Sequence, residues 1–133
     1  MIKIGIIAPK ESRSKLLTLQ IFQKLRETYG TTGFELVTGG SDGIEKQFKK
    51  IVLETIVTYK EFNPSFSDYN SFSALSENYY GKNWHPTHDS DRYRRMIRYC
   101  DRLIFFTDQT DKEVNAYIRY AEKIGKKFAE VKI

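Results

Sequence analysis

The chain is poor in cysteine and has no long apolar run, and each absence excludes a class of protein. Its one cysteine, Cys100, excludes an internal disulfide and a cysteine-based zinc cluster. No apolar stretch approaches the ~20 residues that span a bilayer. Residues 1–8 read as a strand, because they lack the basic start and longer apolar stretch of a signal peptide. We therefore expect a cytoplasmic protein that does not contact a membrane.

Length and charge narrow the class further. The 133 residues are enough for one domain, and we expect a single domain over residues 1–133. The net charge of +5 arises from 22 Lys and Arg against 17 Asp and Glu, and it mildly favours an anionic partner. A local concentration of arginines stands out in the second half. Its members are Arg92, Arg94, Arg95, Arg98 and Arg102. Helical spacing places Arg94 with Arg98 on one face and Arg95 close to Arg102 on another.

Apolar periodicity predicts strands that alternate with helices. The strands are expected at residues 2–8, 34–37, 55–59, 102–106 and 127–133. The helices are expected at residues 14–28, 43–54, 90–100 and 111–124. This alternation predicts an α/β fold: a single Rossmann-like three-layer domain with a mostly parallel five-stranded sheet. Ligands of such sheets bind at the carboxyl ends of the strands.

A glycine-rich turn joins the second predicted strand to the second helix. It reads Thr-Gly-Gly-Ser-Asp-Gly, so the candidate ligand-binding residues are Gly39, Gly40, Ser41, Asp42 and Gly43. Glycine lets the backbone approach a ligand, and the first N–H groups and the dipole of the following helix face an anion. The turn therefore indicates a site for a nucleotide or a sugar phosphate. The alternative is a plain strand-to-helix turn with a Ser or Asp N-cap and no ligand.

Residues 63–89 break the alternation. They are rich in Ser, Asn, Asp and aromatic residues, and they are too long for an ordinary connection. The segment is either a ligand lid or an added interaction surface. Six aromatic residues there offer flat area that can stack a base, although we favour a role in anchoring the loop. They are Phe66, Tyr69, Phe72, Tyr79, Tyr80 and Trp84, and a short helix is plausible within residues 72–80.

Two histidines at the end of this segment suggest a metal site, but their spacing argues against one. His85 and His88 are three residues apart, whereas a helical zinc pair is spaced i, i+4, and no cysteine ligand is at hand. A histidine that caps a turn or touches a ligand phosphate is the better interpretation. We expect no metal and no cofactor.

The order of these motifs resembles the SLOG superfamily of Rossmann-like nucleotide-binding proteins. The resemblance lies in Gly-Gly-x-x-Gly at residues 39–43, Arg-x-x-x-Met at residues 92–96, Thr-x-x-Glu at residues 110–113 and Gly-Lys at residues 125–126. It covers nearly the whole chain outside residues 63–89. The superfamily includes the Lonely Guy phosphoribohydrolases, which cleave the N-glycosidic bond of nucleoside 5′-monophosphates, and DNA-processing proteins. Nucleoside deoxyribosyltransferases look similar around the last turn and helix.

The resemblance implies roles for individual residues. Glu113 is the implied catalytic carboxylate, which stabilises or attacks the oxocarbenium-like sugar or activates water against it. Arg92 is implied to orient phosphate or ribose hydroxyls. The three glycines of the turn are implied to admit the phosphate, and Thr110 to add a hydroxyl donor. Four further candidates lie near the ligand end of the sheet by their place in the chain. They are Ser12 and Arg13 after the first strand, Arg95 in the arginine motif, and Thr107 after the fourth strand.

One departure from the resemblance leaves the activity open. The phosphoribohydrolases carry a glycine-rich turn before their glutamate, whereas residues 106–113 contain no glycine. Without glycine, the N–H groups of that turn approach a phosphate less freely. Two functions therefore remain: an enzyme acting on an N-glycosidic bond, or a module that senses or sequesters a nucleotide-derived ligand unchanged. Single-stranded nucleic acid binding is a lesser alternative, and the resemblance also implies a homodimer.

Overall fold

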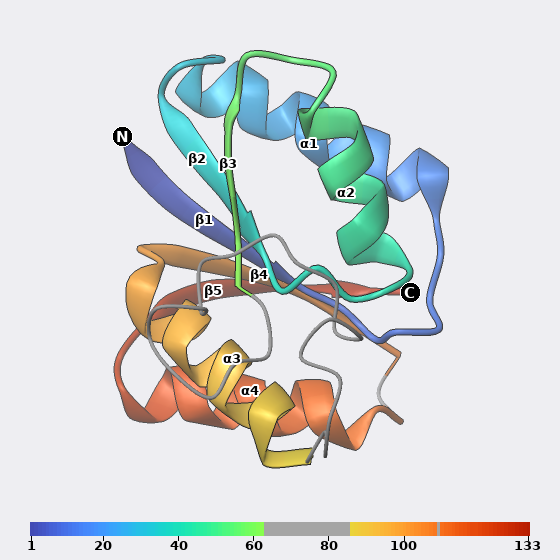
Figure 1. Cartoon of the computed structure of the whole chain (residues 1–133), viewed down its shortest axis with the longest axis vertical. Coiled ribbons are helices and arrows are strands. Elements are labelled where there is room, and N and C mark those ends of the chain that lie inside the picture. Colours follow the sequence, from blue (N-terminus) through green and yellow to red (C-terminus); the bar gives the residue numbers. More distant parts are fainter. Residues whose placement is uncertain (63–85, 109) are drawn as a thin grey trace.

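The computed structural model describes residues 1–62, 86–108 and 110–133. Within these residues, five strands alternate strictly with four helices. The strands are β1 (Ile2–Ile7), β2 (Phe34–Thr38), β3 (Thr58–Glu61), β4 (Arg102–Thr107) and β5 (Lys127–Lys132). The helices are α1 (Lys15–Tyr29), α2 (Ile44–Val52), α3 (Pro86–Tyr99) and α4 (Lys112–Lys123). Figure 1 shows the sheet between the two pairs of helices.

The five strands form one parallel sheet in the order β3-β2-β1-β4-β5. The order reverses between β1 and β4, which is the position where open α/β sheets bind ligands. This confirms the predicted α/β class, the Rossmann-like layering and the five-stranded sheet. Because all strands run the same way, the turns that follow them meet at one edge of the sheet, called here the carboxyl edge.

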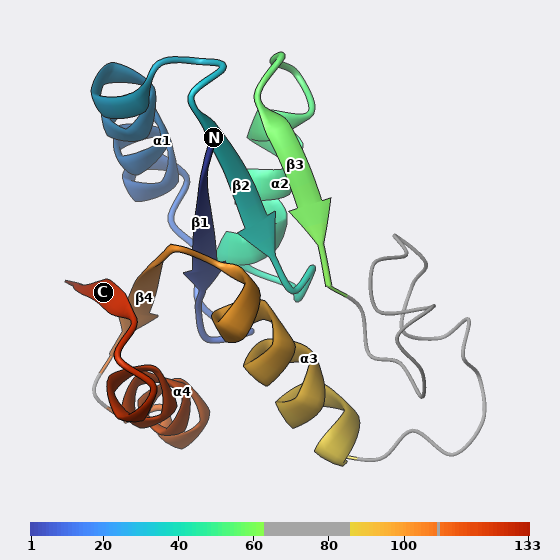
Figure 2. The ribbon, with the colours of Figure 1, turned by 90° about the vertical axis from the view of Figure 1, so that its left-hand side faces the viewer.

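Each face of the sheet carries its own apolar core. On one face, Phe22 of α1 and Phe48 of α2 pack with Ile4 and Ile6 of β1. On the other face, Met96 of α3 and Ile118 of α4 pack with Phe105 of β4. The strands are buried on both faces at the centre of the sheet, which explains their nearly continuous apolar sequences. Figure 2 shows α3 and α4 together beside β4.

Two elements begin three or four residues away from the expected position. The third strand begins at Thr58, three residues later than expected, because residues 53–57 continue the end of α2 as a turn. There the Thr55 hydroxyl donates to the Val52 carbonyl, and the Ile56 side chain is 77% exposed. The β-branched residues suggested a strand, but local side-chain bonds to the backbone favoured a turn.

The third helix begins at Pro86, four residues earlier than expected. Proline is common at the first helical position because its missing N–H has no helical partner there. His88 therefore lies in helical backbone. The expectations for residues 63–85, including the loop-anchoring aromatic residues, His85 and the short helix, lie outside the described residues.

No helix in the described part of the chain has both the length and the apolar character needed to cross a membrane.

Candidate functional site at the carboxyl edge

The carboxyl edge is organised around the buried carboxylate of Glu45. Glu45 lies in the first turn of α2, and its side chain is fully buried. Its Oε1 accepts a hydrogen bond from the Gly39 N–H at 2.8 Å, and its Oε2 accepts from the Ala8 N–H at 3.3 Å and from the Tyr93 hydroxyl at 2.8 Å. One side chain thus connects the ends of β1 and β2 with α2 and α3.

The Glu45 carboxylate is the acceptor for two backbone N–H groups at the ends of β1 and β2. The N–H groups of Ala8 and Gly39 already have an anionic acceptor inside the protein. These two N–H groups are therefore not available to an external anion. A phosphate placed at the same donors would be repelled by the Glu45 carboxylate.

Burial and neighbours act in opposite directions on the pKa of Glu45. Burial raises this pKa above its ordinary value of 4.5, because the charged form loses its hydration. The positive charge of Arg92 and the hydrogen bonds from Tyr93 and the Gly39 backbone lower it, and the net direction is upward. Burial, followed by the charge of Glu45, also raises the pKa of Tyr93 well above its ordinary value, so Tyr93 remains a hydrogen-bond donor.

Arg92 is buried beside this carboxylate, with 2% of its surface exposed. Its Nη1 donates to the Gly39 carbonyl at 2.9 Å, and its guanidinium lies 4.8 Å from the centre of the Tyr93 ring. Arg92 and Glu45 therefore bond the carbonyl and the N–H of the same glycine. Arg92 therefore lies at the carboxyl edge, where its contacts hold the glycine turn.

A second buried polar cluster lies on the other side of the turn, at the end of β3. The Tyr59 hydroxyl donates to Glu61 Oε1 at 2.7 Å and lies 2.7 Å from the Thr38 hydroxyl oxygen, which accepts from the Gly40 N–H at 3.1 Å. Lys49 Nζ lies 3.0 Å from the same Glu61 oxygen. The cluster ties β2, β3 and α2 to the glycine turn.

Glycine is required at two positions of the turn. Gly40 has a φ of 72°, and a Cβ there would lie 2.6 Å from the Glu61 carboxyl carbon. Gly43 has a φ of 89°, and a Cβ there would overlap the carbonyl oxygens of Ser12 and Lys10. Both conformations favour glycine, and both close approaches are to protein atoms. The glycines are therefore explained by packing of the turn against its surroundings.

The amino terminus of α2 differs from those of two other helices. The Ser14 hydroxyl caps α1 by accepting from the Leu17 N–H, and the Asp111 carboxylate caps α4 by accepting from the Val114 N–H. At α2 the N-cap is Gly43, and no side chain makes the cap hydrogen bond. The first N–H groups of a helix have no partner within it, so this end can accept an outside anion.

A groove opens beside this uncapped end. It has a volume of about 350 Å³, and its floor includes Gly43. Four cationic side chains line it: Arg13 from the turn after β1, and Lys46, Lys49 and Lys50 from α2. A positive groove next to a free helix start is a suitable environment for a phosphate.

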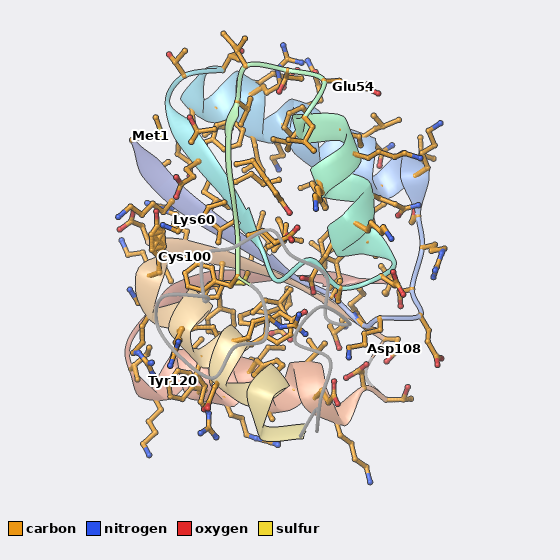
Figure 3. The ribbon with its side chains drawn as sticks, in the orientation of Figure 1. Met1, Glu54, Lys60, Cys100, Asp108 and Tyr120 are labelled. Carbon is orange, nitrogen blue, oxygen red and sulfur yellow. The ribbon has the colours of Figure 1, made fainter. Side chains whose placement is uncertain are left out.

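The turn after β4 is closed by its own acidic side chains. Asp108 Oδ1 accepts from the N–H and the hydroxyl of Thr110 and from the Asp111 N–H, at 2.9, 3.0 and 2.9 Å. The hydrogen bonds from Thr110 hold the pKa of Asp108 below its usual value. Thr110 already has an acceptor for both donors, and Glu113 is exposed in the first turn of α4. Asp108 is labelled in Figure 3.

The other predicted site residues differ in burial and contacts. Ser12 is partly buried, Arg13 is exposed, and Asp42 is exposed with its Oδ1 3.5 Å from Lys46 Nζ. Ser41 and Thr107 are buried, and Arg95 is half-buried in α3. The arginine cluster does not form one patch. Arg98 Nη1 donates to the Tyr120 hydroxyl of α4 at 2.9 Å, and the Arg94 guanidinium lies 5.7 Å from the Tyr120 ring, whereas Arg92 faces inward. Tyr120 is labelled in Figure 3.

Several residues of the site were missed by the sequence reasoning. They are Glu45, Tyr93, Tyr59, Glu61 and the three lysines of α2. The lysines gave a readable signal, because residues 46, 49 and 50 share one helix face. The position of Glu45 was misleading. An acidic residue in a first helical turn is favoured by the helix dipole and is usually exposed, whereas Glu45 is buried.

The fold is shared with two solved structures. One is DNA processing protein A from Helicobacter pylori, which is described as having a unique single-stranded DNA binding mode. Its TM-score is 0.68 and its sequence identity is 19%, and the match covers 97% of this chain and 64% of that chain. The other is the molybdenum cofactor carrier protein from Chlamydomonas reinhardtii. Its TM-score is 0.62 and its sequence identity is 19%, and the match covers 97% of this chain and 75% of that chain. The chain therefore spans less than two thirds of the first protein's length.

These matches agree with the expected fold, a Rossmann-like α/β fold with a parallel five-stranded sheet. No protein-family model matches the chain, and no curated protein has a similar sequence.

Proposed function

We propose that the chain binds a nucleotide, or a small molecule derived from one, at the carboxyl edge of the sheet. The phosphate lies at the amino terminus of α2, between Gly43 and the Arg13 side chain. The observation that carries the proposal is the uncapped start of α2 at the mouth of a groove lined by cations. A groove of about 350 Å³ is within the size range of small-molecule sites.

Binding without chemistry is the form that we favour. The names of the two structural neighbours describe DNA binding and cofactor carriage, and neither describes bond cleavage. The turn after β4 has no glycine, and its donors bond Asp108. Hydrolysis of a nucleoside 5′-monophosphate with Glu113 as the catalytic carboxylate is the alternative, and the same samples test it.

The test is a panel of ribo- and deoxyribonucleoside 5′-phosphates, in which thermal stabilisation and free-base release are followed together. A ligand at 100 times its dissociation constant adds about 2.7 kcal/mol, which gives a visible shift of the melting temperature. Stabilisation without free base supports a sensor or a sequestering protein. Free base that is lost in Glu113→Ala establishes the glycosidase.

A matched pair of variants tests the position of the phosphate. Arg13→Gln removes an exposed cation from the groove, and Arg119→Gln removes an exposed cation from α4. We expect Arg13→Gln to weaken nucleotide binding and Arg119→Gln to leave it unchanged. Equal affinities in both variants would contradict the proposed position, and no stabilisation by any nucleotide would contradict the function.

Single-stranded nucleic acid is a second candidate, favoured by the cations that continue along α2 beyond the phosphate position. Arg92 of α3 does not add to it, because its side chain is buried. For a single strand, the logarithm of the affinity falls with the logarithm of salt concentration with a slope of about −0.7 for each neutralised phosphate. A slope near zero for an oligonucleotide would exclude this candidate.

A further inference from the structure

The cationic groove extends well beyond the amino terminus of α2. Lys46, Lys49 and Lys50 follow one face of the helix, and Leu53, which follows its last turn, also lines the groove. From Lys46 to Leu53 the helix axis advances about 10 Å, at about 1.5 Å for each residue. A single phosphate at the helix start contacts only the first part of this length.

The positive charge of the groove is only partly neutralised by the protein. Lys49 is paired with Glu61 at 3.0 Å, and the Glu61 side chain is nearly buried. Lys46 lies 3.5 Å from Asp42, but both side chains are 69% exposed. Exposed pairs of this kind contribute little and separate readily. No acidic residue is among the described residues that line the groove, so an elongated positive surface remains.

The groove also has an apolar part. Leu53 lines it, and the Leu53 side chain is 64% exposed. A ligand that follows the helix from its amino terminus therefore meets a free helix start, then cations, and finally apolar surface. Phosphates match the first two parts, and the flat face of a base or the carbon skeleton of a sugar matches the third.

We propose that the ligand of this site is a polyphosphorylated nucleotide with three or more phosphates. Its terminal phosphate lies at the start of α2, its phosphate chain runs along Lys46 and Lys50, and its nucleoside lies toward Leu53. This inference rests on the proposed function, because it uses the same terminal phosphate position. It differs in the property that it predicts, which is a preference for the longer phosphate chain.

The experiment is a titration of the protein with AMP, ADP and ATP by calorimetry, in buffer that contains EDTA so that the free nucleotides are the probes. We expect affinity to increase with each phosphate and ATP to bind about tenfold more tightly than AMP, from two or three exposed ion pairs. Inorganic triphosphate should compete with ATP, since it carries the same charged chain.

A pair of double variants locates the effect. Lys46→Gln with Lys50→Gln removes two cations from the groove, and Lys123→Gln with Lys127→Gln removes two exposed cations elsewhere. The net charge changes equally in both. We expect the ratio of ATP affinity to AMP affinity to fall to near one in the groove variant and to stay about tenfold in the control. Unchanged melting temperatures show that both variants fold.

The outcomes separate the two proposals. Equal affinities of the wild type for AMP and ATP would overturn the polyphosphate inference and leave nucleotide binding intact. A preference for ATP that persists in the groove variant would also overturn it. So would an oligonucleotide that binds more tightly than ATP and is lost in the groove variant. No binding of any nucleotide would overturn both proposals.

Discussion

The carboxylate of Glu45 accepts a hydrogen bond from the backbone N–H of Gly39 at 2.8 Å, so the first turn of α2 holds the glycine turn that leads into it. The same carboxylate reaches the end of β1 through Ala8 and helix α3 through Tyr93. The shape of the carboxyl edge therefore depends on a buried carboxyl group. This arrangement makes predictions about stability that are independent of any ligand.

Glu45→Ala should destabilise the fold strongly. The substitution removes the acceptor of three buried donors and leaves the buried charge of Arg92 without its anionic neighbour. Removing one member of a buried charge pair typically lowers the free energy of unfolding by about 3–5 kcal/mol. Urea unfolding measures the loss. Glu122→Ala, an exposed residue of α4, is the control and should change stability by about 0.5 kcal/mol or less. Similar small losses in both variants would contradict the role of Glu45.

The pH dependence of stability should carry the signature of Glu45. Its folded-state pKa is raised above the ordinary value of 4.5, so at higher pH the unfolded chain releases this proton before the folded protein does. The contribution of Glu45 to stability is therefore fully present below pH 4.5 and is lost as the pH rises through the folded-state pKa. Glu45→Gln cannot titrate. The stability of the wild type relative to this variant should fall as the pH rises above 4.5, and a constant difference would contradict the raised pKa.

Much of the fold was predictable because its signals are local. The apolar stretches of β1, β4 and the first turns of the helices identified the elements, and the alternation identified the parallel sheet. The error at residues 55–59 has a local cause as well. The Thr55 hydroxyl bonds the Val52 carbonyl and so extends the turn after α2, which the β-branched composition does not reveal.

The centre of the site was not predictable, because its contacts join distant parts of the chain. Glu45 meets Ala8 across 37 positions and Tyr93 across 48 positions. No spacing rule relates such residues, and each alone has an ordinary explanation in its own helix. The motif at Gly39 and Gly40 was located correctly by its position between a strand and a helix. Its close packing against Glu61 depends on the parallel pairing of β2 with β3.

Gly40→Ala should be more harmful than an alanine at another glycine with a similar φ. Gly40 and Gly125 have φ values of 72° and 76°, but a Cβ at Gly40 would lie 2.6 Å from the Glu61 carboxyl carbon, whereas at Gly125 nothing lies within 4 Å. Gly125→Ala should lower the free energy of unfolding by about 1–2 kcal/mol from backbone strain alone. Gly40→Ala should lose more, because Glu61 must move away from Lys49.

A double variant tests the cause of that excess. In the Glu61→Ala background the carboxyl group is absent, so the excess loss from Gly40→Ala should shrink toward the value for Gly125→Ala. Chemical denaturation of the four proteins of this cycle measures the coupling. An excess that is unchanged without the Glu61 carboxyl group would show that backbone conformation, and not the close approach, limits the residue at position 40.

The thiol of Cys100 should be protected from chemical modification in the folded protein. Cys100 lies at the end of α3, its side chain is fully buried, and burial raises its pKa to about 12. Because the thiolate is the reactive form, modification at pH 8 requires opening of the structure. The chain has a single cysteine, so the total signal of a thiol reagent reports this residue. Figure 3 labels its position. Rapid labelling of the native protein, at the rate seen in urea, would contradict the burial.

Replacing Arg92 with lysine distinguishes a structural role of this residue from a ligand-binding role, because the two roles predict different effects of the substitution. Its guanidinium is buried, lies against the Tyr93 ring, and donates to the Gly39 carbonyl at 2.9 Å. Arg92→Ala should lower the free energy of unfolding by about 3–5 kcal/mol, since it leaves the Glu45 carboxylate buried without the nearby cation. Arg92→Lys retains the charge but not the planar fork, and it should recover part of this stability. Arg94→Ala, at an exposed position of the same helix, is the control.

If Arg92 only anchors the glycine turn, nucleotide affinity and stability should recover together in the lysine variant. Recovery of stability with affinity still lost would instead assign the guanidinium a direct contact with the ligand, as the sequence motif implies.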